Sequence, residues 1–191
     1  MKPEFQQSAL LIMDMQAGIV RNLPNASIHL AKATEAIATA RQLHIPIIYV
    51  VVGFRDGMPE ISTHNKGFSS LRERLTGADM SQFMAVVPEL APQDGDVVVT
   101  KRRISAFTGS DLEVVLRAKQ LRHLVLTGFS TSGVVLSTLR EAADKDYELT
   151  VLHDCCADGD EEVHRVLTTK IFPRQATVMG TEEWKRGLWG H

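Results

Sequence analysis

The chain has 191 residues, of which 44% are hydrophobic and 23% charged, and its formal net charge is -2. This length and composition are typical of a globular protein with one hydrophobic core, so we expect a single domain over residues 1–191. The two signs of charge are scattered along the chain, which argues against a nucleic-acid partner, because such partners require a concentrated basic surface.

Two further features bear on the compartment. Residues 1–7 show no signal-peptide pattern, and no apolar run reaches the roughly 18 to 20 residues that span a bilayer. The two cysteines, Cys155 and Cys156, are adjacent, and neighbouring cysteines rarely pair, so we interpret them as reduced thiols. These features favour a cytoplasmic protein without a membrane partner.

Short apolar runs rich in β-branched residues alternate along the chain with longer segments of helical periodicity. The runs are Ala9 to Met13, Ile45 to Val52, Val97 to Val99, Leu124 to Leu126, Leu149 to Leu152 and Ala176 to Val178. The expected helices cover about residues 30–40, a segment from Ser110 onward, residues 131–145, residues 160–172 and a last segment from Thr181. This alternation predicts an α/β fold of three layers (α/β/α), with a doubly wound, six-stranded, mostly parallel sheet of the flavodoxin-like type.

The segment from Gly53 to Pro59 interrupts the alternation with two glycines, a proline and mixed charges, and we expect a long loop there. In open α/β sheets, ligands bind at the carboxyl ends of the strands. The active site is therefore expected directly after the apolar runs.

Two charged residues stand at such strand ends. Asp14 follows the first run and Lys101 follows the third, and together they form a plausible proton-transfer pair. The alternative from spacing alone is that Asp14 caps a loop and Lys101 points into solvent.

Four motifs in the same order resemble the isochorismatase-like family, which also contains nicotinamidases and N-carbamoylsarcosine amidases. They are ALLIMDMQ from Ala9, KRRISAFTGSDL from Lys101, the segment from Leu124 to Ala142, and His153-Asp154-Cys155 with Glu162 and His164. The resemblance covers nearly the whole chain, although it is loose between Gly53 and Pro92. It implies the same α/β fold, a hydrolase that acts on a small molecule, and a homo-oligomer (a dimer or larger).

In that family an aspartate, a lysine and a cysteine form the catalytic triad. The resemblance places Asp14 and Lys101 on the first two positions. Gly128, Thr131 and Thr138 fit the third segment without a gap, and this register places Val134 on the nucleophile position. A valine cannot attack a carbonyl, so the thiol route of the amidases is closed.

Isochorismatases proper also lack the cysteine and hydrolyse a vinyl ether by protonating it. By resemblance, Asp14 is then the acid, and Lys101 tunes it and helps to hold an anionic substrate. Backbone N–H groups at Ser130 and Val134 are a candidate oxyanion site at a helix start. Relatives have a cis peptide before this loop, which corresponds to Phe129-Ser130 here.

Gln16, Phe107, Thr131 and Gly133 are the candidate substrate-binding residues, with helix capping as the alternative for Thr131 and core packing for Phe107. We expect no metal, because Asp56 and the isolated His64 lack a second histidine nearby, and no cofactor. Cys155 is a possible displaced nucleophile, although free cysteines are commonly buried in the core.

The sequence thus predicts a hydrolase acting on a small polar or anionic metabolite by a thiol-independent mechanism of Asp14 and Lys101. A non-catalytic relative that binds a ligand or serves as an oligomeric partner is the main alternative. An amidase with a displaced nucleophile, either Cys155 or a hydroxyl, is a weaker one.

Overall fold

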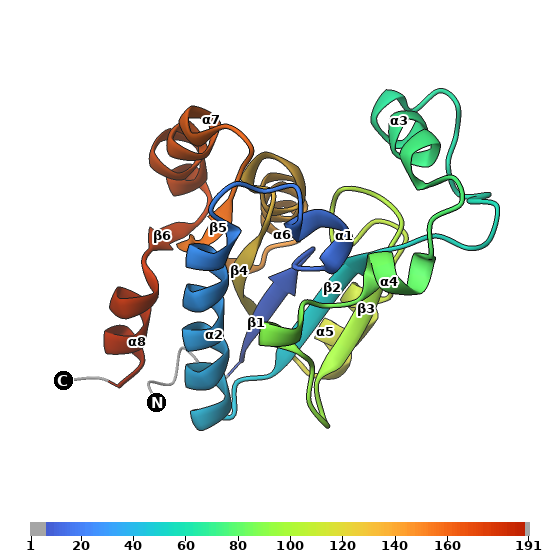
Figure 1. The fold of residues 1–191 in the computed structure, drawn as a ribbon. Coiled ribbons are helices and arrows are strands. Elements are labelled where there is room, and N and C mark those ends of the chain that lie inside the picture. Colours follow the sequence, from blue (N-terminus) through green and yellow to red (C-terminus); the bar gives the residue numbers. More distant parts are fainter. Residues whose placement is uncertain (1–6, 190–191) are drawn as a thin grey trace.

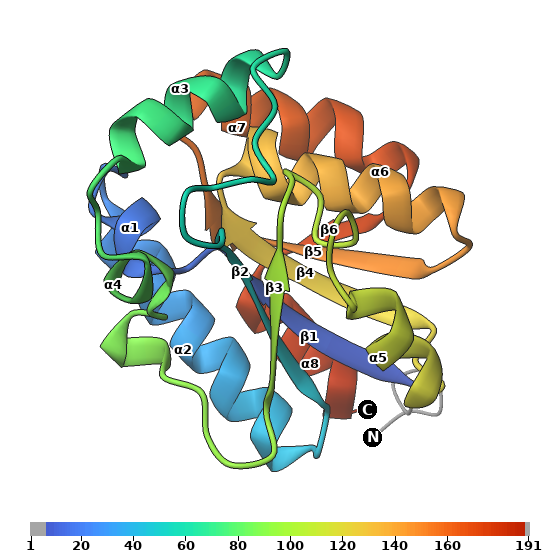
Figure 2. The same ribbon diagram turned by 90° about the vertical axis from the view of Figure 1, so that its right-hand side faces the viewer.

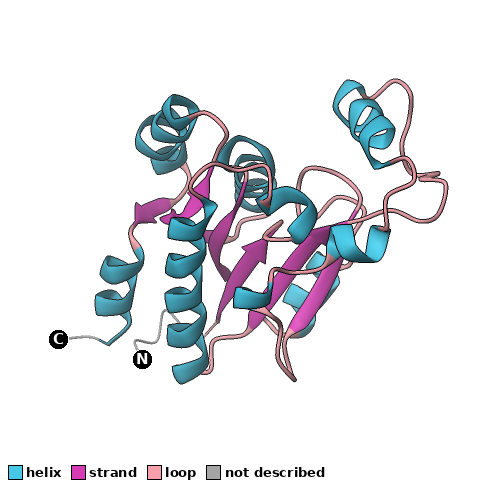
Figure 3. Cartoon of the chain, in the orientation of Figure 1, coloured by secondary structure: helices cyan, strands magenta, loops and turns pink. Residues whose placement is uncertain are grey.

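The computed structural model describes residues 7–189 and contains one sheet at its centre (Figures 1 and 3). Its strands are β1 (Ser8–Met13), β2 (Ile47–Val52), β3 (Val97–Lys101), β4 (His123–Phe129), β5 (Glu148–Ala157) and β6 (Thr177–Met179). Every pairing is parallel, and the order across the sheet is β3-β2-β1-β4-β5-β6. The predicted six-stranded, doubly wound sheet is confirmed. Because the winding reverses between β1 and β4, the carboxyl ends of these two strands form the switch point where ligands are expected.

Helices cover both faces of the sheet, as Figure 2 shows for α2 and α8 on one side and α5 and α6 on the other. The α-helices are α1 (Ala17–Val20), α2 (Ala26–Gln42), α3 (Lys66–Leu75), α4 (Met80–Met84), α5 (Leu112–Ala118), α6 (Leu136–Asp144), α7 (Glu161–Val166) and α8 (Thr181–Trp189). Four shorter helical turns are η2 (Pro88–Leu90), η3 (Thr131–Val135), η4 (Leu167–Ile171) and η5 (Phe172–Arg174). None of the described helices is long and apolar enough to cross a membrane.

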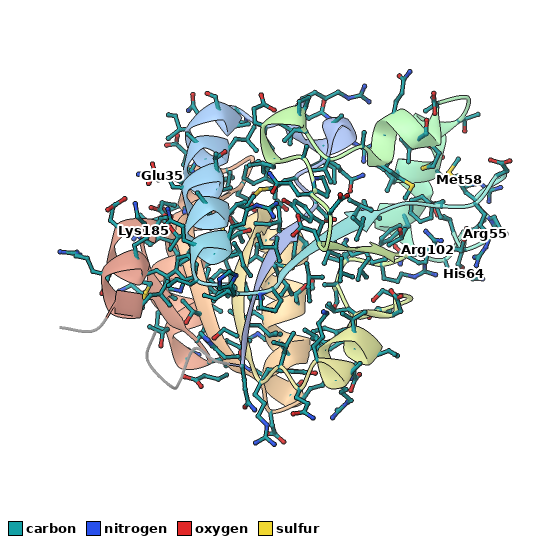
Figure 4. The ribbon with its side chains drawn as sticks, turned by 90° about the horizontal axis from the view of Figure 1, so that it is seen from below. Glu35, Arg55, Met58, His64, Arg102 and Lys185 are labelled. Carbon is teal, nitrogen blue, oxygen red and sulfur yellow. The ribbon has the colours of Figure 1, made fainter. Side chains whose placement is uncertain are left out.

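Two hydrophobic cores lie on opposite faces of the sheet, because successive residues of a strand point to opposite sides. Leu11 and Met13 of β1 pack toward α5 and α6, whereas Leu10 and Ile12 pack toward α2 and α8. Strands that are buried on both faces explain why the apolar runs are continuous rather than alternating. Figure 4 shows Glu35 of α2 near Lys185 of α8, whose charged atoms lie 3.6 Å apart.

A third core belongs to the excursion, which we define as residues 53–84 between β2 and the segment leading to β3. Figure 1 shows α3 standing out from the sheet, and Figure 4 shows Arg55, Met58 and His64 at the end of the molecule opposite Lys185. The expected loop at Gly53–Pro59 is present, but the sequence analysis did not predict α3 and α4. The buried side chains of this core are Val52 of β2 and, from the excursion, Phe54, Met58, Ile61, Phe68, Leu75 and Phe83.

The outer end of β5 differs from the prediction. We expected His153 to Cys156 to follow the strand, but β5 continues to Ala157. The register of its pairing with β4 shifts between Leu126 and Gly128. Beyond the shift the two strands continue to pair, Gly128 with Cys156 and Phe129 with Ala157. Cys155 and Cys156 therefore point to opposite faces of the sheet, each into a core.

Candidate active site

Asp14 and Lys101 meet at the carboxyl end of the sheet, although β2 lies between their strands. Asp14 follows β1 in a left-handed backbone conformation (φ 56), which aspartate tolerates better than most residues, and its N–H donates to the Val50 carbonyl. Lys101 ends β3 and reaches across the end of β2, so that its Nζ lies 3.0 Å from Asp14 Oδ2. The side chain of Asp14 is only 7% exposed, and that of Lys101 is only 3% exposed.

This burial changes the acidity of Asp14. Removal from water raises the pKa of the Asp14 carboxyl from 3.8 to about 6, and the positive charge and hydrogen bond of Lys101 oppose part of that rise. The second oxygen, Oδ1, is buried and has no hydrogen-bond partner among residues 7–189. Asp14 is thus a carboxyl group that changes its protonation near neutral pH and keeps one oxygen uncommitted.

The ammonium group of Lys101 is fully occupied by the protein. In addition to Asp14, it donates to the carbonyl oxygens of Arg103 at 2.9 Å and Ile104 at 3.0 Å. An ammonium has three protons, so none remains for a substrate. We had expected Lys101 both to tune Asp14 and to help hold an anionic substrate, and these three contacts favour the first of the two roles.

The loop after β4 carries the residues around the nucleophile position. The peptide bond between Phe129 and Ser130 is cis, as the resemblance implied. Ser130 Oγ accepts from the Gly133 N–H at 3.1 Å, and the Ser130 carbonyl accepts from Val135 N–H at 3.3 Å. Ser132 N–H donates to the Asp158 carboxylate at 2.7 Å. The N–H groups of Ser132 and Gly133 are therefore already bound by side chains, whereas no side chain among residues 7–189 binds those of Ser130 and Val134, the predicted oxyanion candidates.

A cavity of about 240 Å³ lies beside Asp14, and we call it the Asp14 cavity. It brings together five of the predicted residues, namely Asp14, Lys101, Ser130, Gly133 and Val134. The sequence analysis missed the rest of the lining, which is Ile19, Leu23, Val52, Phe68, Leu71, Ile104 and Phe129. Apart from Asp14, Lys101 and Ser130, the lining is apolar, which strengthens electrostatic interactions within the cavity.

Three predicted substrate-binding residues lie outside this cavity. Gln16 has no exposed surface; its Nε2 donates to the carbonyls of Val52 and Phe83, and its Oε1 accepts from Val52 N–H. These bonds clamp the excursion to the sheet, which favours a structural role for Gln16 over substrate binding. Phe107 packs in the core near Tyr147, with ring centroids 6.0 Å apart. The core-packing alternative is therefore the better interpretation of Phe107.

Thr131 is the third of these residues, and it has a partner that the sequence could not identify. Its Oγ1 lies 2.8 Å from His164 Nδ1, yet Thr131 has no exposed surface. His164 lines a different cavity of about 610 Å³, which contains neither Asp14 nor Lys101. The buried Thr131 hydroxyl therefore links the loop to α7, which favours a structural role for this residue.

The two thiols are also unsuited to attack. Cys155 and Cys156 have no exposed surface, and burial raises the pKa of both, that of Cys156 to about 12. Cys155 Sγ contacts Thr181 Oγ1 at 3.1 Å. Both therefore behave as small core residues, not as displaced nucleophiles.

Asp56 and His64, the residues considered for a metal, are exposed on the excursion (His64 is labelled in Figure 4). Within the described part of the chain, no group of three or more histidine, cysteine, aspartate or glutamate side chains is arranged to hold a metal ion.

Comparisons with known proteins agree with the fold and the motifs. The model of the isochorismatase domain matches residues 8–183. The uncharacterized isochorismatase family protein YwoC of Bacillus subtilis (strain 168) is 33% identical over 181 residues, covering 95% of this chain and 94% of that protein. The ureidoacrylate amidohydrolase RutB of Stutzerimonas stutzeri (strain A1501) is 32% identical over 198 residues, covering 92% and 76%. The structure of an isochorismatase family protein from Burkholderia thailandensis matches with a TM-score of 0.84 at 29% identity, covering 96% of each chain.

Proposed function

This chain belongs to the isochorismatase family of hydrolases, and we propose that it hydrolyses a small polar or anionic metabolite without a thiol, using Asp14 as the acid. The observation that carries the proposal is the Asp14 carboxyl, which lines the cavity with a pKa raised to about 6 and leaves Oδ1 unbonded. A carboxyl with such a pKa is protonated in a useful fraction near neutral pH and still acidic enough to donate.

Vinyl-ether hydrolysis suits this arrangement. Protonated Asp14 donates its proton to the terminal alkene carbon, and water attacks the resulting oxocarbenium ion. The Asp14 carboxylate then accepts a proton from that water, and the hemiketal collapses to a carbonyl compound and an alcohol. Lys101, 3.0 Å away, stabilises the carboxylate that forms when the proton leaves.

Because Val134 stands at the position of the nucleophilic cysteine, this chain is not expected to share the thiol mechanism of its amidohydrolase relatives. Val134 lines the Asp14 cavity, is 2% exposed, and has no group that can form a covalent acyl intermediate. The two cysteines are buried in the cores, and Thr131 is equally inaccessible. An amidase that uses a displaced thiol or Thr131 is therefore disfavoured, and Ser130 is the hydroxyl that remains in the cavity lining.

The non-catalytic alternative predicts a ligand in the cavity but no turnover. A relative that only binds has no need for a buried acid, whose burial in a charged state is unfavourable. Retention of the Asp14–Lys101 pair at the cavity therefore favours the catalytic proposal.

A hydrolysis screen with wild type and Asp14→Asn tests the proposal. The panel contains isochorismate, other enol ethers, small amides and ureides. We expect turnover of an enol ether by wild type, and a loss of roughly two or more orders of magnitude in kcat/KM in the variant, because an amide cannot donate the proton. Turnover that survives in Asp14→Asn, or a ligand bound without turnover of any class, would refute Asp14 acid catalysis.

The assembly and the compartment are part of the same proposal. We propose that residues 1–191 form one domain that assembles into a homodimer or larger oligomer in the cytoplasm. The mass in solution, measured by light scattering after size-exclusion chromatography, tests the assembly.

A further inference from the structure

A second cavity opens directly beside the Asp14 cavity, and we call it the arginine cavity. It has a volume of about 310 Å³ and is lined by Gly18, Ile19, Arg21, Asn22, Leu23, Val52, Leu71, Arg74, Leu75 and Phe83. Ile19, Leu23, Val52 and Leu71 line both cavities, so the two are adjacent and share these residues as a wall. We propose that Arg21 and Arg74 bind a carboxylate of the substrate, whose apolar body lies across the shared wall and whose reacting bond lies at Asp14.

This inference rests on the proposed function, because it takes Asp14 as the site of the reaction. It adds a substrate class: a small carboxylic acid with an apolar segment between the carboxylate and the bond that is hydrolysed.

The charge of the combined lining supports an anionic ligand. The two cavities contain three basic side chains, Lys101, Arg21 and Arg74, and one acidic side chain, Asp14. Lys101 is satisfied by Asp14 and two backbone carbonyls. The arginines are therefore the only cations in this lining that retain donors for a ligand.

Neither arginine is engaged by the protein. Arg21 and Arg74 are exposed, and within residues 7–189 neither forms an ion pair or a hydrogen bond. Arg102 and Arg103, which follow Lys101 in the sequence, instead donate to the carbonyls of Gly53 and Glu60, respectively. A guanidinium group presents a planar fork of donors that matches a carboxylate, so two arginines without protein partners at one cavity offer donors suited to a carboxylate.

The backbone fixes where these arginines stand. Arg21 directly follows α1 as its C-cap, and α1 packs against α4 through Gly18, where a Cβ would lie 2.0 Å from the Phe83 ring. Arg74 lies in the last turn of α3, which stands above α4 in Figure 1. The two helices thus bring one arginine each to the same cavity from segments far apart in the sequence.

The rest of the arginine cavity selects an apolar body. Val52, Leu75 and Phe83 are buried at its base, and the shared wall is aliphatic. Because burial of apolar surface contributes about 25 cal/mol per Å², this wall favours a hydrocarbon segment over a second charged group.

Binding of a matched pair of probes tests the inference without requiring turnover. The probes are 3-phenylpropionate and its neutral amide, 3-phenylpropionamide, and their Kd values are measured by NMR titration. We expect the carboxylate to bind wild type about tenfold more tightly than the amide, and more weakly as salt is added. Arg21→Gln and Arg74→Gln are each expected to raise the Kd of the carboxylate by about tenfold and to leave that of the amide unchanged.

Two controls separate this result from other causes. Arg174→Gln removes an exposed arginine that lines neither cavity, so the carboxylate is expected to keep its wild-type Kd. Asp14→Asn is expected to bind the carboxylate at least as well as wild type, because the variant removes a negative charge. Binding that depends on the two arginines supports the inference even if the hydrolysis screen refutes Asp14 catalysis.

Three results would overturn the carboxylate site regardless of the hydrolysis screen. They are equal affinity for the acid and the amide, an unchanged carboxylate Kd in both arginine variants, and a carboxylate Kd weaker than about 10 mM for wild type.

Discussion

The floor of the Asp14 cavity and its outer wall differ in burial and in the way their side chains are held. The floor consists of the strand-end residues Asp14 and Lys101 and the loop from Ser130 to Val134. Its charged pair is nearly inaccessible to water, and Lys101 has three partners. The wall comes from α1 and α3, and its residues Ile19, Leu23 and Leu71 are only half-buried.

This contrast suggests a division of labour. The floor is held by hydrogen bonds to a rigid sheet, which suits groups that must keep a fixed geometry for proton transfer. The wall is apolar and is shared with the arginine cavity, which suits contacts that select the substrate. Changes in the floor are therefore expected to affect the reaction, and changes in the wall are expected to affect binding.

Gln16 joins the sheet, which carries the floor, to the excursion, which carries part of the wall. Its removal is expected to have the largest effect on stability. Gln16→Ala breaks three buried hydrogen bonds to Val52 and Phe83 and leaves their polar groups unpaired. We expect a loss of about 3 kcal/mol in the free energy of unfolding, and a Tm lower by about 6 to 12 °C. Calorimetry measures both, with Gln82→Ala, an exposed glutamine of α4, as the control. A Tm shift no larger than that of the control would show that Gln16 does not clamp the regions.

In the floor, Lys101→Met tests the charge partner of Asp14. Lys101 lowers the pKa of Asp14, so its removal is expected to raise that pKa above about 6 and to make Asp14 a poorer proton donor. We expect kcat/KM to fall by about 10- to 100-fold and its pH dependence to move to higher pH. Lys145→Met, which removes a half-buried lysine paired with Glu113, is the control. A shift of the pH dependence to lower pH would contradict the assignment.

In the wall, Leu71→Ala is expected to act on binding more than on the reaction. The variant removes apolar contact from both cavities, and we expect KM to rise by about 3- to 10-fold with kcat nearly unchanged. Leu43→Ala, a half-buried leucine at the far end of α2, controls for general loosening of the fold. A fall in kcat with an unchanged KM would mean that the wall takes part in the reaction.

The smallest expected effect is that of thiol alkylation. Cys155 and Cys156 are buried with raised pKa values, so iodoacetamide is expected to leave the native protein unlabelled and its activity unchanged. Mass spectrometry counts the adducts, and the unfolded chain should carry two. Val134→Cys is the matched positive variant, since it places a thiol in the cavity lining. Labelling of the wild type with loss of activity would revive the displaced-thiol alternative.

The sequence identified the floor because its residues follow continuous apolar runs. Asp14 and Lys101 stand directly after strands that are buried on both faces, and the register of Gly128 and Thr138 places Val134 in the cavity. Such positions depend on local pattern and on the parallel topology, and both are readable from one chain.

The wall was not predicted because it depends on packing between distant segments. Phe68 and Leu71 lie in α3, whose short apolar stripe is interrupted by charged residues, and Ile19 lies in a four-residue helix. Gln16 was predicted as a substrate-binding residue for a related reason. A polar residue beside a strand end is equally compatible with lining a pocket and with bonding two segments of the chain together. Only the partners at Val52 and Phe83, 36 and 67 residues away, distinguish these roles.

The most direct test of the account is the pKa of Asp14 itself, measured by 13C NMR titration of the carboxyl groups with Asp14→Asn for assignment. The account predicts a pKa near 6 instead of the ordinary 3.8. At Asp14 the native state then binds more protons than the unfolded state between these values, so the contribution of Asp14 to the free energy of unfolding, measured as wild type minus Asp14→Asn, should fall as pH rises from about 4 to 6. A carboxyl that titrates at or below about 4, with no such fall in stability, would contradict the assignment of Asp14 as the proton donor.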